Sequence, residues 1–327
     1  MNRTSPSPKI LSSDTPRLRV TERLYALLVA MRPRQWTKNL AIFVGIVFAQ
    51  RLLNPVLFGR ATLAFAAFCL VSSGIYLFND LLDLENDRQH PKKKLRPLAA
   101  GTLPTSWAKV TIGFLWLGGA GLSTLLFFVP IDGPDTFAAL GGANVLFACT
   151  LASYIVLMVL YGLRLKHVVL LDVFIIAAGF ALRILAGAVA VPVIISPWLY
   201  VVTIMLSLMM AFGKRRNELV LMEGQASNHR QILKEYSLPL LDQMITIVTA
   251  TTIMAYSLYT FQASTGNHQL MITIPLVLYG VFRYLYLVYV RKEGGSPEEV
   301  LLRDRHMLGT VVLCIAVVIV VLYLLPH

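Results

Sequence analysis

Long stretches without a charged side chain are the feature that most limits how this chain can fold. Four of them contain no Lys, Arg, Asp or Glu: Ala61–Asn79, Val110–Ile131, Thr136–Leu163 and Met307–His327. About 20 consecutive apolar residues are enough for a helix to cross a bilayer. The chain of 327 residues is also 57% hydrophobic and only 14% charged. A soluble protein could not bury so much apolar surface, so we expect an integral membrane protein.

Two longer uncharged stretches each divide into a pair of helices. Ile184–Phe212 contains Pro192 and Pro197, which suit a tight turn, and Gln243–Phe282 is interrupted by a polar segment at 262–269. We therefore predict an all-α, polytopic membrane protein with nine transmembrane helices. The predicted helices are 38–57, 60–80, 106–129, 136–161, 168–191, 197–213, 239–261, 271–290 and 307–325.

Positive charge is distributed unevenly between the two sets of loops that these helices define. With the N-terminus on the cytoplasmic side, 25 of the 29 Lys and Arg residues lie in cytoplasmic segments. Membrane proteins concentrate Lys and Arg in their cytoplasmic loops, so this orientation is the one we predict. The same rule accounts for the formal net charge of +12, and we expect no nucleic-acid partner.

The rest of the composition limits the domain organisation. Residues 1–22 are polar and contain Ser and Pro, so we predict a disordered cytoplasmic tail, followed by a single integral-membrane domain at 23–327. The three cysteines lie far apart in apolar stretches. Neither a zinc site nor a disulfide framework is therefore expected.

The most informative polar segment follows the second predicted helix and reads NDLLDLEND at 79–87. Asp80, Asp83 and Asp87 are spaced i, i+3 and i+7, which places them on one face of a helix. Carboxylates on one stripe repel each other unless a cation lies among them. Oxygen ligands without Cys or His favour Mg²⁺, which usually binds together with substrate phosphates. Asn79 adds a neutral oxygen or a donor to a phosphate. The alternative is a solvated loop, but carboxylates at the end of a membrane helix are costly unless they are used.

Basic residues follow the acidic segment directly. Lys93 and Arg96 are candidate phosphate ligands, whereas Lys92 and Lys94 are better explained by the cytoplasmic topology. An acidic face that holds a metal, next to a basic cluster, suits a diphosphate group. The sequence therefore predicts a magnesium-dependent site for a diphosphate substrate.

The segment NDLLDLEND followed by KKKLRPLAAG resembles the signature of the UbiA superfamily of intramembrane prenyltransferases, which fold as bundles of nine helices. The aromatic-prenyltransferase branch carries a second aspartate-rich motif in the loop after the sixth helix. Here that place reads GKRRNE at 213–218. This basic run resembles instead the decaprenyl-phosphate phosphoribosyltransferases, as do RPRQWTKN at 32–39 and YGLRLKHVVLLDV at 161–173 with Arg183 beyond.

The resemblance implies transfer of 5-phosphoribose from phosphoribosyl pyrophosphate to a polyprenyl phosphate such as decaprenyl phosphate. It also implies a bacterial cytoplasmic membrane, an active site facing the cytoplasm, Mg²⁺ held by Asp80, Asp83 and Asp87, and a product that feeds arabinose donors. Substrates with more phosphates call for more fixed cations, which agrees with the basic run. The candidate substrate-binding residues are Asn79, Lys38, Lys93, Arg96, Tyr161, Lys166, Asp172, Arg183, Lys214, Arg215 and Glu218.

Some of these residues have a second interpretation. Asp172 and Arg183 are separated by about 16 Å along one helix, and each either contacts substrate or belongs to a structural ion pair. Lys38 either marks the membrane interface or holds the lipid phosphate. Glu218 either pairs with a basic neighbour or contacts the metal or the ribose.

Two alternatives remain for the whole chain. The first is transfer of a prenyl group from a prenyl diphosphate to an aromatic acceptor, and the second is a transporter or non-enzymatic lipid-binding protein. The sequence leaves open the length of the polyprenyl chain and the oligomeric state, a homo-oligomer included.

Overall fold

The computed structural model describes residues 19–129, 131, 133–223, 231–262, 268–295, 300 and 303–325. All regular structure within these residues is helical. Eight of the described helices, some extended by a short 3-10 or π turn, are long and apolar enough to cross a membrane. They are α3 (Pro55–Leu82), α5 (Thr105–Leu125), α7 (Ala143–Leu163), α8 (Leu171–Ala190), α9 (Pro197–Glu223), α10 (Leu238–Gln262), α11 (Ile274–Tyr289) and α13 (Arg305–Ile319).

Shorter helices connect or flank the long ones. Before α3 lie α1 (Val20–Met31), the 3-10 helix η1 (Pro33–Ile42) and α2 (Phe43–Phe48). The others are α4 (Leu84–Gln89), η2 (Lys93–Leu95), η3 (Leu126–Phe128), α6 (Asp135–Ala139), η4 (Leu165–His167), η5 (Gln231–Glu235), η6 (Gln269–Thr273) and the π turn η7 (Val320–Leu324).

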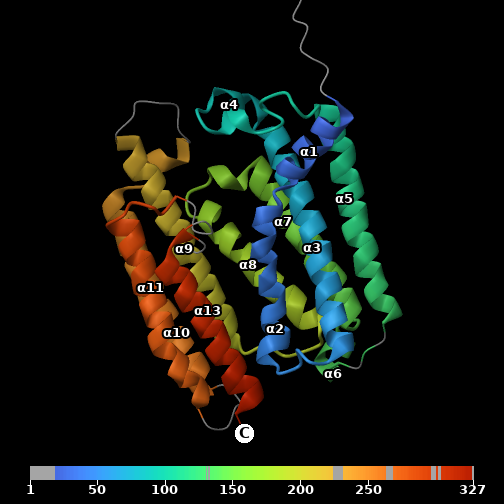
Figure 1. Ribbon diagram of the computed structural model, residues 1–327, viewed down its shortest axis with the longest axis vertical. Helices are drawn as coiled ribbons and strands as arrows, with labels where there is room; N and C mark the ends of the chain where they lie inside the picture. Colours follow the sequence, from blue (N-terminus) through green and yellow to red (C-terminus); the bar gives the residue numbers. More distant parts are fainter. Residues whose placement is uncertain are drawn as a thin grey trace, which may run out of the picture.

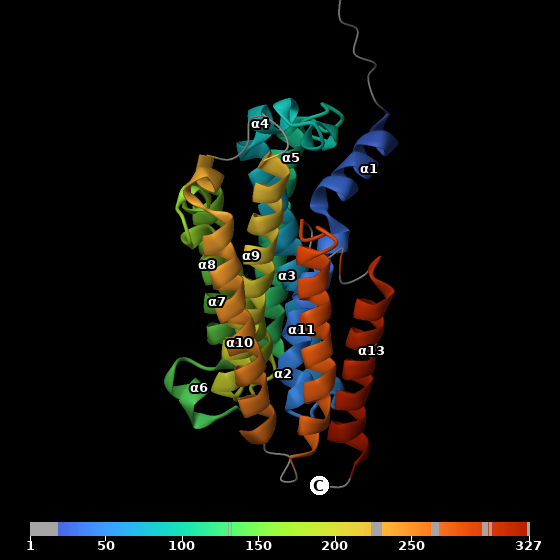
Figure 2. The same cartoon turned by 90° about the vertical axis from the view of Figure 1, so that its left-hand side faces the viewer.

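The long helices lie side by side and run between two ends of the bundle (Figures 1 and 2). At the upper end α4 and α1 lie outside the bundle, and we call this the α4 end. At the opposite end lie α6 and the C-terminus, and we call this the α6 end. Residues 80–96, 164–172 and 214–218 all belong to helix ends or connections at the α4 end.

The eight long helices overlap the second to ninth predicted spans, but the first predicted span, 38–57, is not one helix. Its residues divide between η1, α2, a non-helical connection at 49–54 and the first turn of α3. Asn54 caps α3, accepting hydrogen bonds from the amides of Val56 and Leu57 at 3.0 and 3.1 Å, and Pro55 occupies the first helical position. This pair of residues is a strong helix-start signal, and it ends the preceding segment early.

The path of η1 is fixed by a buried polar side chain. Asn39 is fully buried, and its Nδ2 donates to Ser72 Oγ at 3.2 Å on α3. Gly187 of α8 lets this segment come close, because a Cβ at that position would lie 1.9 Å from the carbonyl oxygen of Ile42. Small residues commonly allow such close backbone approach between membrane helices.

The structure describes only part of the predicted N-terminal tail, and it extends one of the predicted helices. Residues 1–18 of the predicted tail lie outside the described residues, and Val20–Glu22 belong to α1, so the predicted division into tail and domain stays a prediction. The helix predicted at 197–213 continues to Glu223 as α9. The GKRRNE segment, predicted in a loop, is therefore helical.

Candidate active site

The three aspartates of NDLLDLEND do not form one continuous stripe. Helix α3 ends at Leu82 and α4 begins at Leu84, so Asp83 is the junction residue between the two helices. Asp80 lies in the last turn of α3 and Asp87 on α4, and both are buried. The predicted spacing therefore brings Asp80 and Asp87 together across a helix break rather than along one helix face.

Arg96 joins the two buried carboxylates. Its Nη1 donates to Asp80 Oδ1 at 3.1 Å and to Asp87 Oδ2 at 2.6 Å. Lys93 Nζ lies 4.0 Å from Asp87 Oδ1, and its side chain is 41% exposed. Both basic residues predicted as phosphate ligands therefore lie beside the acidic pair.

Arg32 also belongs to this cluster, although it is not among the predicted substrate-binding residues. Its Nη2 donates to Asp80 Oδ1 at 2.5 Å, across a separation of 48 residues. Arg32 adopts the left-handed backbone conformation with φ of 54°, at the turn between α1 and η1. Non-glycine residues rarely hold this conformation, and such strain is concentrated at functional sites. The available signal was the RPRQ run, which places Arg32 before a proline.

Asp83 belongs to a second contact at the same end. It accepts a hydrogen bond from Lys166 Nζ at 2.6 Å. The Lys166 side chain is only 7% exposed, although it lies in the short connection η4 between α7 and α8. This ion pair joins the junction of α3 and α4 to the connection that carries YGLRLKH.

Asn79 carries a buried acceptor without a partner. Its Oδ1 has no hydrogen-bond partner among the described residues. The atom lies directly against α7, because a Cβ on Gly162 would be 2.3 Å from it. A buried polar atom left unpaired is unfavourable, and such atoms are often completed by a ligand.

The second half of the site centres on Arg215 of α9. Its Nε donates to Asp172 Oδ2 at 2.7 Å, and its Nη1 donates to Glu218 Oε2 at 2.5 Å. Asp172 is completely buried in the first turn of α8, whereas the Glu218 side chain is 30% exposed. The pair interpretation of Glu218 is therefore the one that the geometry supports.

Tyr236 completes this half and was not selected from the sequence. Its hydroxyl donates to Asp172 Oδ1 at 2.8 Å and accepts from the amide of Leu170 at 2.9 Å. Burial raises the pKa of Tyr236 well above its usual range, so the hydroxyl stays protonated as a donor. Nothing in the sequence near Tyr236 signals this contact, since the two partners are 64 residues apart.

The two halves meet at the end of α7. Gly162 lies against Asn79, and the preceding residue, Tyr161, is within electrostatic range of Arg215. Lys166, a few residues later, pairs with Asp83. Lys38 on η1 and Lys214 on α9 are both partly buried.

Arg183 lies away from these groups, inside the bundle. It is 5% exposed, and it donates to Asn39 Oδ1 at 2.8 Å, the carbonyl oxygen of Gly179 at 2.9 Å and the hydroxyl of Tyr154 at 2.7 Å. Its partners connect α8 to η1 and α7. The structure does not bring Arg183 together with Asp172, which pairs with Arg215 instead.

The acidic residues of the site were also predicted to bind a metal. Within the described part of the chain, no group of three His, Cys, Asp or Glu side chains lies close enough to hold a metal ion. Asp80 and Asp87 do converge on one cationic atom, and the unpaired oxygen of Asn79 belongs to the residue directly before Asp80. Mg²⁺ commonly binds one or two carboxylates and completes its shell with waters and substrate phosphates. Carboxylate and amide oxygens of this kind suit Mg²⁺, and the assignment of Asp80, Asp83 and Asp87 as its ligands stays a prediction.

Comparison with known proteins decides the family of this chain. Residues 39–303 match the model of the UbiA prenyltransferase family. The chain belongs to the UbiA prenyltransferase family. Its sequence is 31% identical over 312 residues to the decaprenyl-phosphate phosphoribosyltransferase of Corynebacterium glutamicum, covering 92% of this chain and 87% of that protein. It is 32% identical to the enzyme of the same name from Mycolicibacterium smegmatis, over 85% of this chain and 86% of the relative.

Solved UbiA structures share the fold. The structure of a UbiA homolog from Archaeoglobus fulgidus bound to DMAPP and Mg²⁺ matches this chain with a TM-score of 0.67 at 15% identity. The match covers 92% of this chain and 100% of the solved chain. A structure of digeranylgeranylglyceryl phosphate synthase has a TM-score of 0.62 at 21% identity, covering 91% and 99% of the two chains. The resemblance to the UbiA family and to its phosphoribosyltransferase branch is thus confirmed, and this UbiA protein is a multi-pass membrane enzyme.

Proposed function

We propose that this UbiA protein transfers the 5-phosphoribosyl group of phosphoribosyl pyrophosphate to a polyprenyl phosphate, decaprenyl phosphate being the expected acceptor. A phosphate oxygen of the acceptor forms a bond to C1 of the ribose, and the bond from C1 to the diphosphate breaks. The products are polyprenyl-phosphoryl 5-phosphoribose and diphosphate. The acceptor is already an anion at neutral pH, so the reaction needs no strong general base.

The observation that carries this proposal is the charge of the α9 segment. Lys214, Arg215 and Arg216 stand on α9 where an aromatic prenyltransferase would carry a second aspartate-rich motif. A basic segment does not support a second metal cluster at this place. It supports binding of additional substrate phosphate groups. The sequence relationship to two phosphoribosyltransferases supports the same substrate class.

The residues of the α4 end have roles that follow from their charge. Arg32, Lys93 and Arg96 would bind oxygens of the diphosphate, since Arg offers a planar pair of donors and Lys a point charge. Lys166, Lys214 and Arg215 would hold the remaining phosphates.

Asp80 and Asp87 would hold Mg²⁺, with Asn79 contributing its unpaired oxygen. When bound, this ion would neutralise charge on the departing diphosphate. Asp83 would position Lys166 through their ion pair.

The orientation in the membrane is also proposed. The basic residues concentrate at the α4 end, so this end would face the cytoplasm, as would the N-terminus. A water-soluble donor would then reach the site from the cytoplasm of a bacterial cell, while the polyprenyl acceptor stays in the inner membrane.

A direct assay separates this proposal from prenyl transfer. Purified protein in detergent is incubated with Mg²⁺, decaprenyl phosphate and phosphoribosyl pyrophosphate labelled in the ribose, and the lipid fraction is extracted. We expect label in the lipid fraction and release of one diphosphate per product. Absence of lipid-linked label, together with consumption of a prenyl diphosphate and an aromatic acceptor, would favour the alternative reaction.

A further inference from the structure

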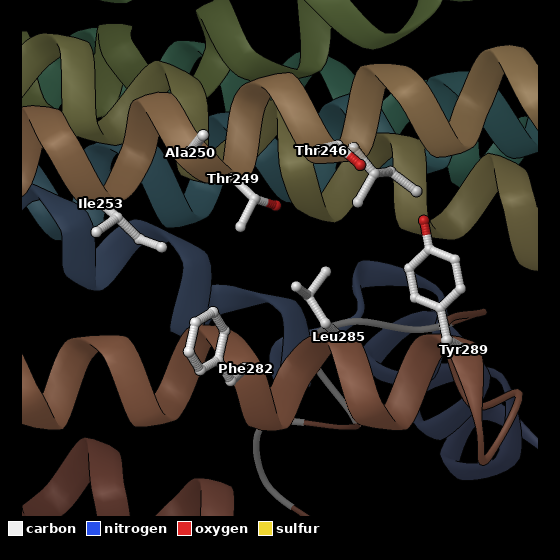
Figure 3. A pocket seen from close by; sticks show the side chains of 8 residues that line it. Thr246, Thr249, Ala250, Ile253, Phe282, Leu285 and Tyr289 are labelled. Carbon is white, nitrogen blue, oxygen red and sulfur yellow. The ribbon is translucent and has the colours of Figure 1, made fainter.

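A groove of about 340 Å³ lies between α10 and α11, outside the candidate active site (Figure 3). This volume is within the range of about 300–1,000 Å³ that small-molecule sites occupy. Helix α10 packs closely along α9 but much less closely along α11, which leaves the space open. One face of each helix contributes to the lining, which includes Thr246, Thr249 and Ile253 of α10 and Phe282 and Tyr289 of α11.

Thr249 makes this groove different from an ordinary apolar seam. The residue is 6% exposed, and its hydroxyl has no hydrogen-bond partner among the described residues. The neighbouring threonines Thr246, Thr251 and Thr252 each donate to the carbonyl four residues earlier, at 2.8, 2.8 and 2.6 Å. Thr249 lines the space between the two helices, and its hydroxyl extends along α10 on the side of Thr246 (Figure 3). An unpaired buried hydroxyl is unfavourable. A ligand with an acceptor atom at this position would satisfy the Thr249 hydroxyl.

Charged groups lie at the end of the groove near Tyr289. The Tyr289 hydroxyl and Arg216 Nε both donate to Asp242 Oδ1, at 3.0 and 2.6 Å. The guanidinium of Arg216 lies 4.2 Å from the centre of the Tyr289 ring. Arg216 and Asp242 thus form an ion pair at the mouth, and both hydrogen bonds end on Oδ1, while the Asp242 side chain stays 38% exposed. This arrangement is complementary to a zwitterionic head group, with a phosphate for Arg216 and an ammonium for Asp242.

We propose that this groove binds one bilayer glycerophospholipid with an ammonium head group, of which phosphatidylethanolamine is the simplest. An acyl ester carbonyl accepts a hydrogen bond from the Thr249 hydroxyl. Thr249 lies seven residues beyond Asp242 on α10, a depth of about 10 Å, and the ester groups of such a lipid lie on the bilayer side of its phosphate. The acyl chain continues along Ile253 and Phe282, which is 54% exposed.

Thr249 and Asp242 also exclude two other classes of lipid. A polyprenyl chain contains only carbon and hydrogen below its phosphate, so it offers no acceptor to Thr249. An anionic lipid without an ammonium group offers no second cation to the exposed carboxylate of Asp242. The proposed site is therefore separate from the acceptor site of the transfer reaction.

Native mass spectrometry of the full-length protein in detergent tests this proposal. The protein is titrated with phosphatidylethanolamine, phosphatidylglycerol or decaprenyl phosphate. We expect one tightly retained phosphatidylethanolamine per chain and at least fivefold lower retention in Thr249→Val, which removes the hydroxyl and keeps the shape. The control, Thr251→Val, loses a hydroxyl that bonds its own helix and should retain the lipid as the unmodified protein does.

A second variant tests the head group without touching the buried hydroxyl. Asp242→Asn should abolish the preference for phosphatidylethanolamine over phosphatidylglycerol. Equal retention in Thr249→Val and Thr251→Val would overturn the proposal, as would equal binding of both phospholipids by the unmodified protein. Displacement of the phospholipid by decaprenyl phosphate would instead assign the groove to the acceptor.

Discussion

Asp80 accepts hydrogen bonds from two arginines that lie on opposite sides of it in the sequence, Arg32 and Arg96. Together with Lys93, these arginines place three positive charges around the two carboxylates of Asp80 and Asp87. The cluster has an excess of one positive charge. A net positive charge at this end attracts a phosphorylated substrate.

Arg96 contacts the carboxylates of both Asp80 and Asp87, so its loss should affect the whole cluster. Arg96→Gln should lower kcat/KM for phosphoribosyl pyrophosphate on the order of 10²-fold, since it removes a charged donor from the site of developing charge. The control is Lys92→Gln, because Lys92 is exposed and is expected to serve membrane topology only. Steady-state kinetics of both variants check this, and similar losses in the two would argue against a phosphate role for Arg96.

The second prediction concerns Gly162. A methyl group at this position would lie 2.3 Å from Asn79 Oδ1 and must displace that side chain. Gly162→Ala should therefore lower kcat/KM by about 10²-fold, because misplacement of a site group by about 1 Å has an effect of that size. Gly59→Ala, with nothing within 4 Å of the added methyl, is the matched control on α3. Normal kinetics for Gly162→Ala would show that the position of Asn79 does not matter.

At the scale of the elements, buried charges hold the helix ends together. At the α4 end Asp172 of α8 pairs with Arg215 of α9, and both side chains are at most 2% exposed. At the α6 end Arg60 of α3 is 1% exposed and has no carboxylate partner in the described structure. Its guanidinium donates instead to the carbonyl oxygens of Ala190, Leu126 and Val129, at 2.7, 3.0 and 2.6 Å. Carbonyls at helix ends carry partial negative charge, which suits a cation.

The Asp172–Arg215 pair allows stability and function to be separated. Arg215→Met leaves the buried Asp172 without its cationic partner, with only the Tyr236 hydroxyl still donating to it. This change should lower the free energy of unfolding by about 3–5 kcal/mol. The double variant Asp172→Leu with Arg215→Met should recover most of the stability, since apolar replacements of a buried pair are often neutral. It should not recover transfer activity, because Arg215 is also expected to bind phosphate.

Thermal unfolding in detergent and lipid-product formation measure the two properties side by side. Recovery of both stability and activity in the double variant would mean that the pair is purely structural.

Substitution of Arg60 should lower stability without changing catalysis. Arg60→Met leaves several carbonyl oxygens unpaired and should lower the free energy of unfolding by about 2 kcal/mol or more. Because Arg60 is at the α6 end, kcat and KM of the protein that remains folded should not change. Arg51→Met is the control, since Arg51 is exposed. A change in KM for either substrate in Arg60→Met would show that the two ends are coupled.

At the scale of the whole molecule, the two ends of the bundle differ in chemistry. The acidic pair, the Lys166 connection and the α9 cations all lie at the α4 end. Between the ends, the outer surface is apolar, with side chains such as Phe114 and Leu117 of α5 each 72% exposed. This division suits an enzyme whose soluble substrate arrives at one end while its lipid substrate stays among the helices.

Much of this architecture follows from the sequence because a bilayer imposes simple rules. Uncharged stretches of about 20 residues must be helical there, and eight predicted spans overlap the observed helices. The exception, 38–57, contains Asn39, whose buried contacts with α3 and α8 replace regular helix packing. A local hydropathy pattern carries no information about such contacts.

The site was predictable only in part, for the same reason. The spacing of Asp80, Asp83 and Asp87 locates the acidic segment, but the helix break at Asp83 decides which two converge. Arg32 and Tyr236 reach their partners across 48 and 64 residues. Pairings at that separation arise from the packing of the bundle, so no motif within either segment could identify them.

Locating the divalent cation by crystallography or electron microscopy tests whether Asp80, Asp87 and the diphosphate bind it together. Crystals or frozen samples of the full-length protein are prepared with Mn²⁺ and phosphoribosyl pyrophosphate, and in crystals the metal is identified by its anomalous signal. We expect Mn²⁺ bound to carboxylate oxygens of Asp80 and Asp87 and to the diphosphate, with Arg215 or Lys214 on another phosphate of the same molecule. Metal bound at Glu218 or Asp172, or a diphosphate remote from Asp80, would contradict this expectation.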